Sequence, residues 1–531
     1  MTAATSNFMT VSSDLPDLDM TSSHRFAYSI LDELLVWREL SYTWCFHRSD
    51  HDQITALPAW ALETLDAHRN DVRPALLSWE TLARGRTGDA LWDAAQASLL
   101  IHGELHNNVR MTWSKALLQW TESPERCWER LVDLNHRYAL DGRDPNSYGG
   151  LMWCLGLFDR PFEPPRPILG SVRSCPLSTH ARRLDVVAYS HHTRRPAFSV
   201  PPKIAVVGAG IAGLTCARTL SDHGLAVRVF DKGRAPGGRT SRRRADPFHF
   251  DHGAQYFTAR DPRFRRHVES WREDGLVDVW PGRMVTIARD RIDDVDTPDD
   301  RFVGVPGMNT LARHLARDLD VTCGAQIEGL SLAADGWHLG GAEVAGFGPF
   351  DMVVVAVPAA QALPLLDATS GLAERVAKVG ISPCWAVLLG FEETLDLPFD
   401  AAWTSDNPLS WVARNNSKPG RPPSESWVLH ARRPWSEAHL EDDAESVAQQ
   451  LQDSFQELTG SGQTPIHRAA HRWRYALAHE PLGEPCLFDR NIGIGVCGDW
   501  CLAGRVEAAF LSGTAMAGRI LSEPERARTA A

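Results

Sequence analysis

The stretch PPKIAVVGAGIAGLTCARTL, residues 201–220, decides the fold of the second half of the chain. A short β-branched run, Ile204–Val207, leads into Gly208-Ala-Gly210-Ile-Ala-Gly213 and then into a helical pattern. The first glycine allows a tight turn, the second lets the backbone approach a pyrophosphate, and the third lets the helix pack against the strand. Because the amino end of the helix then faces the phosphates, this stretch predicts a dinucleotide-binding strand–turn–helix unit.

The residues that follow extend this prediction to a flavin. A second strand pattern, LAVRVF, ends in Asp231, which lies 23 residues after Gly208, where an acidic side chain binds a ribose hydroxyl. The next stretch is Lys232-Gly-Arg234-Ala-Pro-Gly237-Gly238-Arg239. Paired glycines expose backbone amides to phosphate, and arginine adds a fixed positive charge. This extension separates flavin-binding proteins from simple nicotinamide dehydrogenases.

A second piece of the nucleotide site is predicted near the C-terminus. There a strand pattern precedes Gly498-Asp499, and a helix rich in small residues begins near Arg505-Val506-Glu507. We expect Asp499 to accept hydrogen bonds from the flavin ribityl hydroxyls and the helix to direct its positive end at the isoalloxazine ring. The predicted cofactor is FAD, and its predicted contacts in these segments are Gly208, Gly210, Ala212, Gly213, Asp231, Lys232, Arg234, Gly238, Arg239, Asp499, Val506 and Glu507.

The predicted secondary structure of the chain changes at RRPAFSVPPK, residues 194–203. Before it the apolar spacing is helical and strand patterns are scarce, and after it short β-branched runs alternate with helical stretches. We therefore predict two parts, an all-α N-terminal part and an α/β Rossmann-type FAD domain with an inserted mixed α+β substrate domain. The predicted boundaries are a disordered tail at 1–22, a helical domain at 23–190, a linker at 191–202 and the oxidoreductase at 203–522, with the FAD part at about 203–280 and 476–522 and the insertion at about 281–475.

Composition excludes several classes of protein. The chain has 531 residues, 43% of them hydrophobic, and a net charge of −12, which argues against a nucleic-acid surface spread over the whole chain. The N-terminal residues lack the basic start and apolar run of a signal peptide, and no apolar run is long enough to cross a membrane. The ten cysteines form no CxxC pair. We expect a cytoplasmic protein with free thiols, no metal site and a small-molecule substrate.

Residues 203–522 resemble the renalase-like branch of the amine-oxidase superfamily of FAD-dependent oxidoreductases. The stretches that carry it are PGGRTS (236–241), DHGAQYFTARD (251–261), VGVPGMNTLARHLA (303–316), WVARNNSKPGR (411–421), HRWRYA (471–476) and CGDWCLAGRVEAA (497–509). The resemblance implies noncovalent FAD, hydride transfer from substrate to flavin, and reoxidation by oxygen or another acceptor. Renalases act on aberrant isomers of reduced nicotinamide nucleotides, and wider relatives oxidise amines or desaturate. It also implies that Gly253, Ala254, Gln255 and Tyr256 lie near the flavin ring.

The sequence does not assign catalytic residues, because no acid–base pair stands out. That fits a mechanism in which the flavin carries the chemistry and the protein positions the substrate. Ordinary packing and substrate contact are both open for four pocket candidates, Trp411, Asn415, His430 and Tyr475. Trp385 and Trp427 sit in apolar strand patterns and are expected in the core. Arg242-Arg243-Arg244 is expected to be a solvated turn, with attraction of an anionic substrate as the alternative.

The N-terminal part resembles the FAD-binding helical domain of photolyases and cryptochromes, closest to the class II type. The matching stretches include LDELLVWREL (31–40), TGDALWDAAQ (87–96), GELHNNVRMTW (103–113), DGRDPNSYGGLMW (141–153) and SVRSCPLSTHARRLDVVAY (171–189). The resemblance implies that Arg110 and Asp141 pair beside a flavin, that Asn146 approaches its reactive edge, and that Trp92, Trp113 and Trp120 pass an electron to the photoexcited flavin. It is a truncated match, without the antenna domain or the stretch that holds the FAD phosphates.

Three interpretations follow for the whole chain. In the first, an FAD-dependent oxidoreductase carries an accessory helical domain. In the second, the chain is a photolyase- or cryptochrome-like light-responsive flavoprotein, or a DNA photolyase with an attached flavin reductase, and any contact with DNA is made through the N-terminal domain. In the third, the helical domain is purely an interaction module. The number of FAD molecules per chain separates the second interpretation, with two, from the other two, with one.

Overall fold

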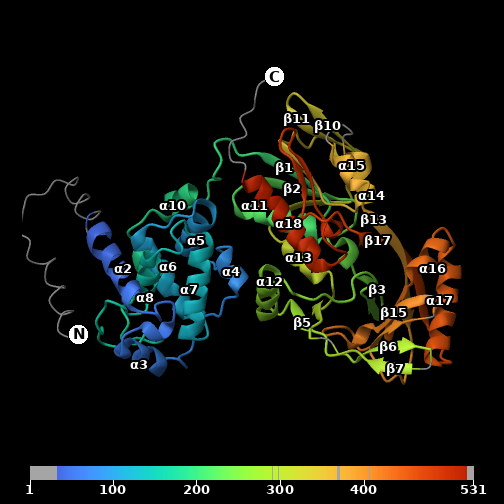
Figure 1. The fold of residues 1–531 in the computed structure, drawn as a ribbon, viewed down its shortest axis with the longest axis horizontal. Coiled ribbons are helices and arrows are strands. Elements are labelled where there is room, and N and C mark those ends of the chain that lie inside the picture. The colour runs from blue at the N-terminus through green and yellow to red at the C-terminus, as the bar shows by residue number, and fades with distance from the viewer. Residues whose placement is uncertain are drawn as a thin grey trace, which may run out of the picture. The chain divides into compact units, whose positions relative to one another are not determined.

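The computed structural model describes residues 31, 33–289, 291–296, 298–366, 371–405 and 407–522, so the predicted tail at 1–22 lies outside the described residues. The contacts divide the chain into two units. The first unit consists of Met1–Leu77 and Gly85–Ser190, and the second consists of Ser78–Arg84 and His191–Ala531. The first unit is helical and the second is an α/β unit with two large sheets, which confirms the predicted fold class (Figure 1).

The first unit is built from helices joined by turns and by a longer non-helical stretch at 155–176. Its elements are η1 (Glu33–Trp37), α2 (Arg38–His47), η2 (Ile54–Ala56), α3 (Ala59–Ala67), α5 (Ala90–His102), α6 (Asn107–Trp120), α7 (Pro124–Tyr138), α8 (Pro145–Cys154), α9 (Leu177–Ala181) and α10 (Val186–Thr193), which runs three residues past the unit's end. Residues 103–106 separate α5 from α6, and residues 139–144 separate α7 from α8.

Side-chain caps explain where these helices begin. The side chains of Asp89, Ser123 and Asp144 each accept a hydrogen bond from a backbone amide in the first turn of α5, α7 and α8. Proline occupies the first position of α7 and α8, where its missing N–H is not needed. Helix α5 ends at Gly103, whose φ of 71° is the left-handed conformation that glycine adopts readily.

The first sheet of the second unit is the predicted nucleotide-binding sheet. It has six strands in the order β18-β19-β12-β1-β2-β9, and all neighbours are parallel except β18 and β19. The strands are β1 (Lys203–Val207), β2 (Ala226–Asp231), β9 (Asp320–Cys323), β12 (Met352–Val355), β18 (Leu487–Asp489) and β19 (Ile494–Val496). Helices α11 (Ile211–Asp222) and α18 (Val506–Leu521) approach so closely that a Cβ on Gly513 would lie 2.2 Å from Ala212 O.

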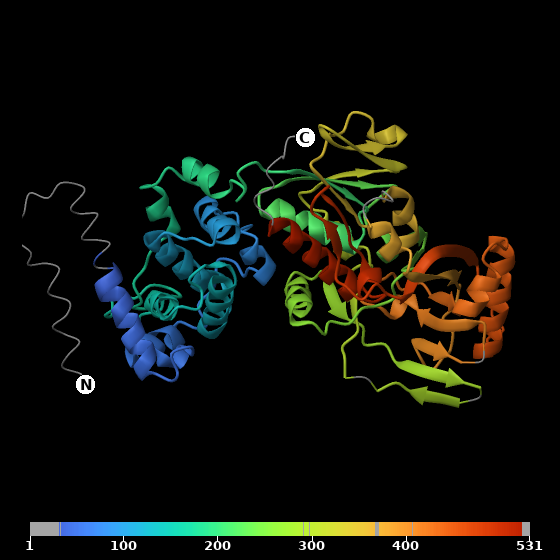
Figure 2. The ribbon, with the colours of Figure 1, turned by 45° about the horizontal axis from the view of Figure 1, so that its top comes forward.

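The second sheet has seven strands in the order β17-β13-β16-β15-β14-β6-β7. They are β6 (Met284–Ala288), β7 (Arg291–Asp294), β13 (Gly380–Gly390), β14 (Ala401–Thr404), β15 (Leu409–Arg414), β16 (Ser426–Ala431) and β17 (His467–Glu480). Helices α16 (Arg433–Ala438) and α17 (Ala444–Thr459), in orange, lie along one side of it (Figures 1 and 2). Trp385 and Trp427 are buried in the core between this sheet and α17, as the sequence predicts.

The remaining elements of the second unit connect these sheets. They are α4 (Trp79–Ala83), η3 (Gly238–Thr240), β3 (Arg243–Ala245), β4 (Phe248–Phe250), α12 (Pro262–Glu273), β5 (Val277–Val279), β8 (Phe302–Gly304), α13 (Thr310–Leu315), β10 (Gly329–Ala333), β11 (Gly336–Gly340), η4 (Ala342–Val344), α14 (Ala359–Ala362), η5 (Leu363–Leu365), α15 (Leu372–Val376), η7 (Asn415–Ser417) and η8 (Asp499–Cys501).

The structure differs from the predicted division of this unit in one respect. Strands β9 and β12 fall inside the span 281–475, which the sequence analysis assigns to one inserted domain, yet both are hydrogen-bonded in the sheet of β1. The chain therefore passes between the two sheets more than once. Sequence patterns identify a strand but do not indicate which sheet it joins, because sheet neighbours need not be neighbours in the sequence.

Residues Ser78–Arg84 make their contacts within the second unit. The Glu80 carboxylate, 4% exposed, accepts a hydrogen bond from Trp271 Nε1 at 2.9 Å, pairs with His314 Nε2 at 2.6 Å and lies 3.5 Å from Arg218 Nη2. Burial alone would raise the pKa of Glu80, but the Arg218 charge and the neighbouring histidines hold it well below its usual range. A buried carboxylate with this many partners makes the short segment an integral part of the second unit.

Candidate functional site

The glycine turn after β1 has the geometry that the sequence predicts. Gly208 has a φ of 114°, and a Cβ there would lie 2.6 Å from Ala356 O. A Cβ on Gly213 would lie 2.0 Å from Gly208 O, so the helix packs directly on the turn. A Cβ on Gly210, the residue that precedes α11, would meet nothing within 4 Å. The turn thus leaves open space at the amino end of α11, where a phosphate group can approach the backbone.

Asp231 closes this turn from the neighbouring strand. Its Oδ2 accepts a hydrogen bond from Ala209 N at 2.6 Å and its Oδ1 accepts one from Gly233 N at 2.6 Å. A carboxylate has about four lone-pair positions, so both oxygens can still accept a hydrogen bond from a ribose hydroxyl. Lys232 and Arg234, which follow, are exposed.

The two predicted pieces of the nucleotide site meet through an ion pair. Arg239 donates two hydrogen bonds to Asp499, from Nη1 to Oδ2 at 2.9 Å and from Nη2 to Oδ1 at 2.5 Å. Gly238 precedes the arginine and is exposed. Both Arg239 and Asp499 are predicted cofactor contacts, but the sequence does not predict their pairing. Glu507, at the start of α18, accepts hydrogen bonds from the backbone amides of Arg260 and Asp261, both at 2.7 Å, so its carboxylate anchors that segment.

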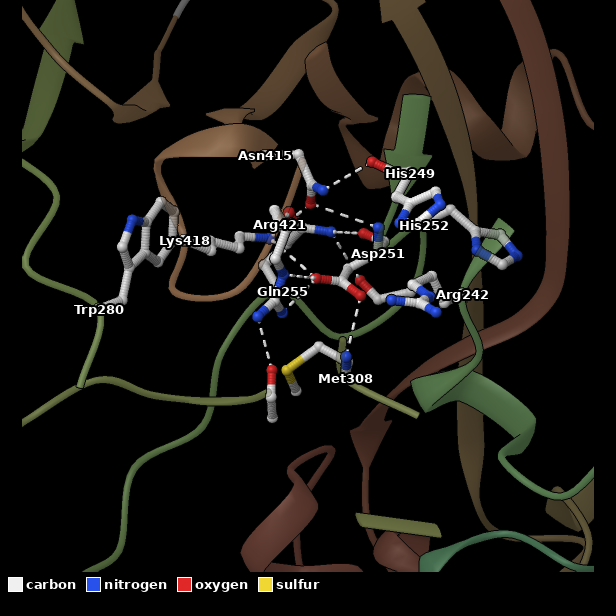
Figure 3. A network of polar contacts seen from close by, with 12 residues as sticks. Arg242, His249, Asp251, His252, Gln255, Trp280, Met308, Asn415, Lys418 and Arg421 are labelled. Atoms are coloured by element: carbon white, nitrogen blue, oxygen red, sulfur yellow. Dashed lines mark hydrogen bonds and ion pairs between the residues drawn. The ribbon is translucent and has the colours of Figure 1, made fainter. Parts of the chain in front are cut away.

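A buried ionic network holds the loop that contains the predicted flavin-ring contacts (Figure 3). Asp251 Oδ2 accepts hydrogen bonds from Arg421 Nη2 at 2.5 Å and Nε at 3.1 Å, and Asp251 Oδ1 accepts one from Met308 N at 2.9 Å. Lys418 Nζ lies 3.8 Å from Asp251 Oδ2 and donates to Gln255 Oε1 at 3.0 Å. The side chains of Asp251 and Lys418 have no exposed surface, and that of Arg421 is 1% exposed.

The charges in this network shift one another's protonation. Burial alone would raise the pKa of Asp251, but the Arg421 and Lys418 charges lower it below the ordinary value. Burial lowers the pKa of Lys418 to about 7, although Asp251 opposes this shift. Asn415, a predicted pocket residue, is part of the network: its Oδ1 accepts a hydrogen bond from Lys418 Nζ at 3.1 Å, and its Nδ2 donates to His249 O at 2.8 Å.

Histidine and tryptophan side chains lie on the other side of the same loop. The His252 ring stacks on Trp473 at a centroid distance of 5.1 Å and lies edge-on to His471 at 4.8 Å. His430, another predicted pocket residue, has its Nε2 3.3 Å from His252 O. Burial lowers the pKa of both His252 and His430 to about 4, so both rings are neutral at neutral pH. Tyr475 is half-buried in β17, two residues after Trp473.

The remaining predicted site residues are Gly253 and Ala254 of the flavin-ring loop and the arginines 242–244. Gly253 and Ala254 are half-buried, and a Cβ on Gly253 would lie 2.0 Å from Arg239 O, which brings the flavin-ring loop against the nucleotide-site arginine. Arg242 is half-buried and donates to Pro306 O at 2.8 Å, whereas Arg243 and Arg244 are exposed. Arg243 and Arg244 lie in strand β3, so the predicted turn is wrong, and the stretch 242–244 is solvated only in part.

The first unit reproduces two arrangements that the photolyase resemblance implies. Arg110 donates to Asp141 at 3.2 and 3.3 Å. The Trp92 ring stacks on Trp113 at a centroid distance of 5.8 Å and meets Trp120 edge-on at 5.5 Å. The order along this series is therefore Trp113–Trp92–Trp120, from two buried rings to a half-buried one.

Sequence reasoning missed the roles of Asp251, Lys418 and Arg421. Asp251 lies in DHGAQYFTARD, and Lys418 and Arg421 lie in WVARNNSKPGR. The presence of charged residues in these two stretches is the signal from which the sequence could have indicated them. Their pairing joins residues 170 positions apart, which no local pattern reports. Among the described residues, no group of three or more His, Cys, Asp or Glu side chains is placed to hold a metal ion. No helix in the described ranges is long and apolar enough to span a bilayer.

Comparisons with known proteins agree with the two-part division. Residues 206–271 match the family model for an NAD(P)-binding Rossmann-like domain, and residues 283–521 match that for flavin containing amine oxidoreductases. A solved structure of a protein assigned as a protoporphyrinogen oxidase, from Exiguobacterium sp. 255-15, has the same fold, with a TM-score of 0.52 at 12% identity over 61% of this chain and 99% of that one. The C-terminal part is thus similar to flavin-containing amine oxidoreductases over residues 283–521, and this match indicates an enzyme.

The N-terminal part is homologous to photolyases. A deoxyribodipyrimidine photo-lyase of Oryza sativa subsp. japonica is 36% identical over 168 residues, which is 32% of this chain and 33% of that protein. The chain thus spans about a third of the length of the curated photolyases that it matches. A zeta-carotene-forming phytoene desaturase of Myxococcus xanthus is 47% identical over 51 residues, 10% of each chain.

Replacing Asp251 by Asn tests the buried network. The substitution leaves Arg421 without a counter-charge in the core, and we expect the free energy of unfolding to fall by about 3–5 kcal/mol in chemical denaturation. The control is Asp320→Asn, since Asp320 is 51% exposed and pairs with Arg228 on the surface. We expect a change of at most about 1 kcal/mol there. Equal effects of the two substitutions would contradict the role given to the Asp251 network.

The buried histidines predict a pH dependence of stability. Their pKa is about 4 in the folded protein and about 6.5 in the unfolded chain, so below pH 6.5 the unfolded state binds protons that the folded state does not. The free energy of unfolding should therefore fall as the pH drops from about 6.5 to about 4, by at most about 3 kcal/mol per histidine.

Denaturation of His430→Gln over this pH range measures the effect. Removing one such histidine should flatten the fall in stability, whereas His338→Gln, at a 44% exposed side chain, should leave the slope unchanged. A His430→Gln slope identical to that of the unmodified protein would exclude the buried histidine as its source.

Proposed function

We propose that the second unit binds FAD noncovalently and oxidises a small substrate by hydride transfer to it, and that oxygen or another acceptor then takes up the electrons. One observation carries this proposal. The glycine turn follows β1, Asp231 ends β2, and Asp499 follows β19, so the predicted cofactor contacts gather at the carboxyl ends of parallel strands in one sheet. Ligands of open α/β sheets bind at this edge.

The residues present fit FAD. The open space at Gly210 suits a pyrophosphate, Asp231 retains acceptor capacity for a ribose, and Arg239 and Asp499 offer a charged pair beside the flavin-ring loop. When bound, FAD supplies a two-electron acceptor. The protein's own part is to hold Gly253–Tyr256 in one position through Asp251, Lys418 and Arg421, and to orient the substrate. The nearby His252 is neutral at neutral pH and adds no charge to the site.

For the substrate we propose a reduced nicotinamide-type molecule or an amine. The match of residues 283–521 to amine oxidoreductases supports an amine. The resemblance of stretches such as DHGAQYFTARD and WVARNNSKPGR to renalases supports a reduced nicotinamide-type substrate. Both donate a hydride, and a protonated amine must first release its proton to solvent or to a basic side chain.

Replacing Gly210 by Leu tests the cofactor site. The side chain would fill the space that the pyrophosphate needs, so we expect the purified variant to lose at least nine-tenths of its FAD, measured by flavin absorbance after release. Gly462→Leu is the matched control, because a Cβ there also meets nothing within 4 Å but lies away from the glycine turn. Full FAD content in Gly210→Leu would contradict this assignment of the site.

A second candidate function is a light response in the first unit. Two observations favour it: the contact series Trp113–Trp92–Trp120, which leads from buried rings to a half-buried one, and the Arg110–Asp141 pair. We propose, as the rival to a purely accessory domain, that this unit holds a second flavin which these tryptophans reduce after illumination. Contact with DNA would belong to this candidate.

Blue-light spectroscopy of Trp113→Phe tests this rival. If the series carries electrons, the unmodified protein shows light-dependent flavin absorbance changes and Trp113→Phe abolishes them, because phenylalanine is much harder to oxidise. Trp128→Phe, at another buried tryptophan of the same unit, should retain them. Identical responses in Trp113→Phe and the unmodified protein would remove the support for this candidate.

A further inference from the structure

Three tryptophans surround Tyr256, the last of the predicted flavin-ring contacts. Trp403 and Trp411 are directly opposite each other on β14 and β15, with ring centroids 4.6 Å apart. The Tyr256 ring lies 5.8 Å from Trp411 and 6.4 Å from Trp403. Trp280 completes the group at 6.4 Å from Trp411 and 6.5 Å from Tyr256. We call these four residues the aromatic cluster.

A cation lies on the accessible side of the aromatic cluster. Trp280 and Trp411 are buried, whereas Tyr256 and Trp403 are half-buried. The guanidinium carbon of Arg301, also half-buried, lies 5.5 Å from the centroid of Trp403 and 5.9 Å from that of Tyr256. Within the described part of the chain Arg301 has no carboxylate partner, so its charge rests on two aromatic faces and can still bind an anion.

The cluster also contains a donor that the protein does not use. Trp411 Nε1 is buried and has no hydrogen-bond partner among the residues that the structure describes, and the residue is 6% exposed. Trp280, by contrast, donates from its Nε1 to Ser417 Oγ at 3.0 Å. A buried donor left unpaired is unfavourable, so a site that keeps one is more stable when a ligand supplies an acceptor.

We infer that the aromatic cluster and Arg301 form a binding site for a planar conjugated group that carries an anionic substituent, such as a ring carboxylate. The flat ring is held against Tyr256 and Trp403, the anion pairs with Arg301, and an acceptor atom receives the Trp411 N–H. The inference rests on the proposed function, because only the position of Tyr256 near the flavin makes the ligand a substrate. It also chooses between the proposed substrate classes.

The positive charge of Arg301 decides between the two proposed substrate classes. A protonated amine bound on the same rings would lie beside the Arg301 guanidinium, and like charges at that distance repel. Lys418 Nζ, 5.1 Å from the Trp280 ring centroid on the buried side, adds to the positive potential when it is protonated. The geometry therefore favours a planar anion over a protonated amine.

Probe binding to the FAD-loaded full chain tests the inference. Benzoate, benzyl alcohol and benzylamine share one ring and differ in charge, and their binding is followed by calorimetry and by the change in the flavin absorbance band. We expect benzoate to bind at least tenfold more tightly than benzylamine, with benzyl alcohol between them. Arg301→Gln should weaken benzoate binding at least tenfold, and Arg301→Lys should restore part of it.

Two further variants keep the test decisive. Trp411→Phe keeps an aromatic ring at this position but removes the N–H donor, and it should weaken benzoate binding several-fold. Arg291→Gln, at an exposed arginine of β7, is the matched control and should leave the dissociation constant unchanged. Tighter binding of benzylamine than of benzoate, no detectable benzoate binding, or an unchanged constant in Arg301→Gln would each overturn the inference. If the protein holds FAD and an amine reduces that FAD, the inference is overturned but the proposed function stands. If the protein holds no FAD, the proposed function is overturned.

Discussion

The Asp251 carboxylate, buried with Arg421 and Lys418, is the constraint on which the candidate site depends. Charges without exposed surface are tolerated only when they are paired and hydrogen-bonded, so the segments that supply the partners must meet at one place. Here those segments are the loop 249–256, the turn 304–308 and the stretch 415–421. These contacts hold the loop that carries Gly253 to Tyr256 in place before any ligand binds.

The two sheets of the second unit supply the surroundings of that loop. The carboxyl ends of β1, β2 and β19 bring the glycine turn, Asp231 and Asp499 together on the nucleotide side. On the other side, the strand register places Trp403, Trp411 and His430 opposite one another on neighbouring strands of the seven-stranded sheet. Since paired residues share a face of a sheet, one face presents a row of aromatic side chains toward Tyr256 and His252. The site is therefore built at the boundary of two sheets.

The parts that the sequence could predict are those encoded locally. A strand, a glycine turn and a helix lie within the 20 residues that open the domain, and their geometry follows from the glycines. The Arg239–Asp499 pair joins residues 260 positions apart, and the Asp251–Arg421 pair 170, so the residue types were visible but their meeting was not. Arg301 lies in no recognisable motif, and only the placement of two aromatic rings beside it gives it a role. Similarly, nothing in the local pattern of β9 and β12 reveals that they return to the first sheet.

We propose that this protein holds a single flavin, bound by the second unit, and the FAD content of the purified full chain measures this number. FAD is released by denaturation, quantified by absorbance and compared with protein concentration from amino-acid analysis. We predict one FAD per chain. Two FAD molecules per chain, or none, would contradict it.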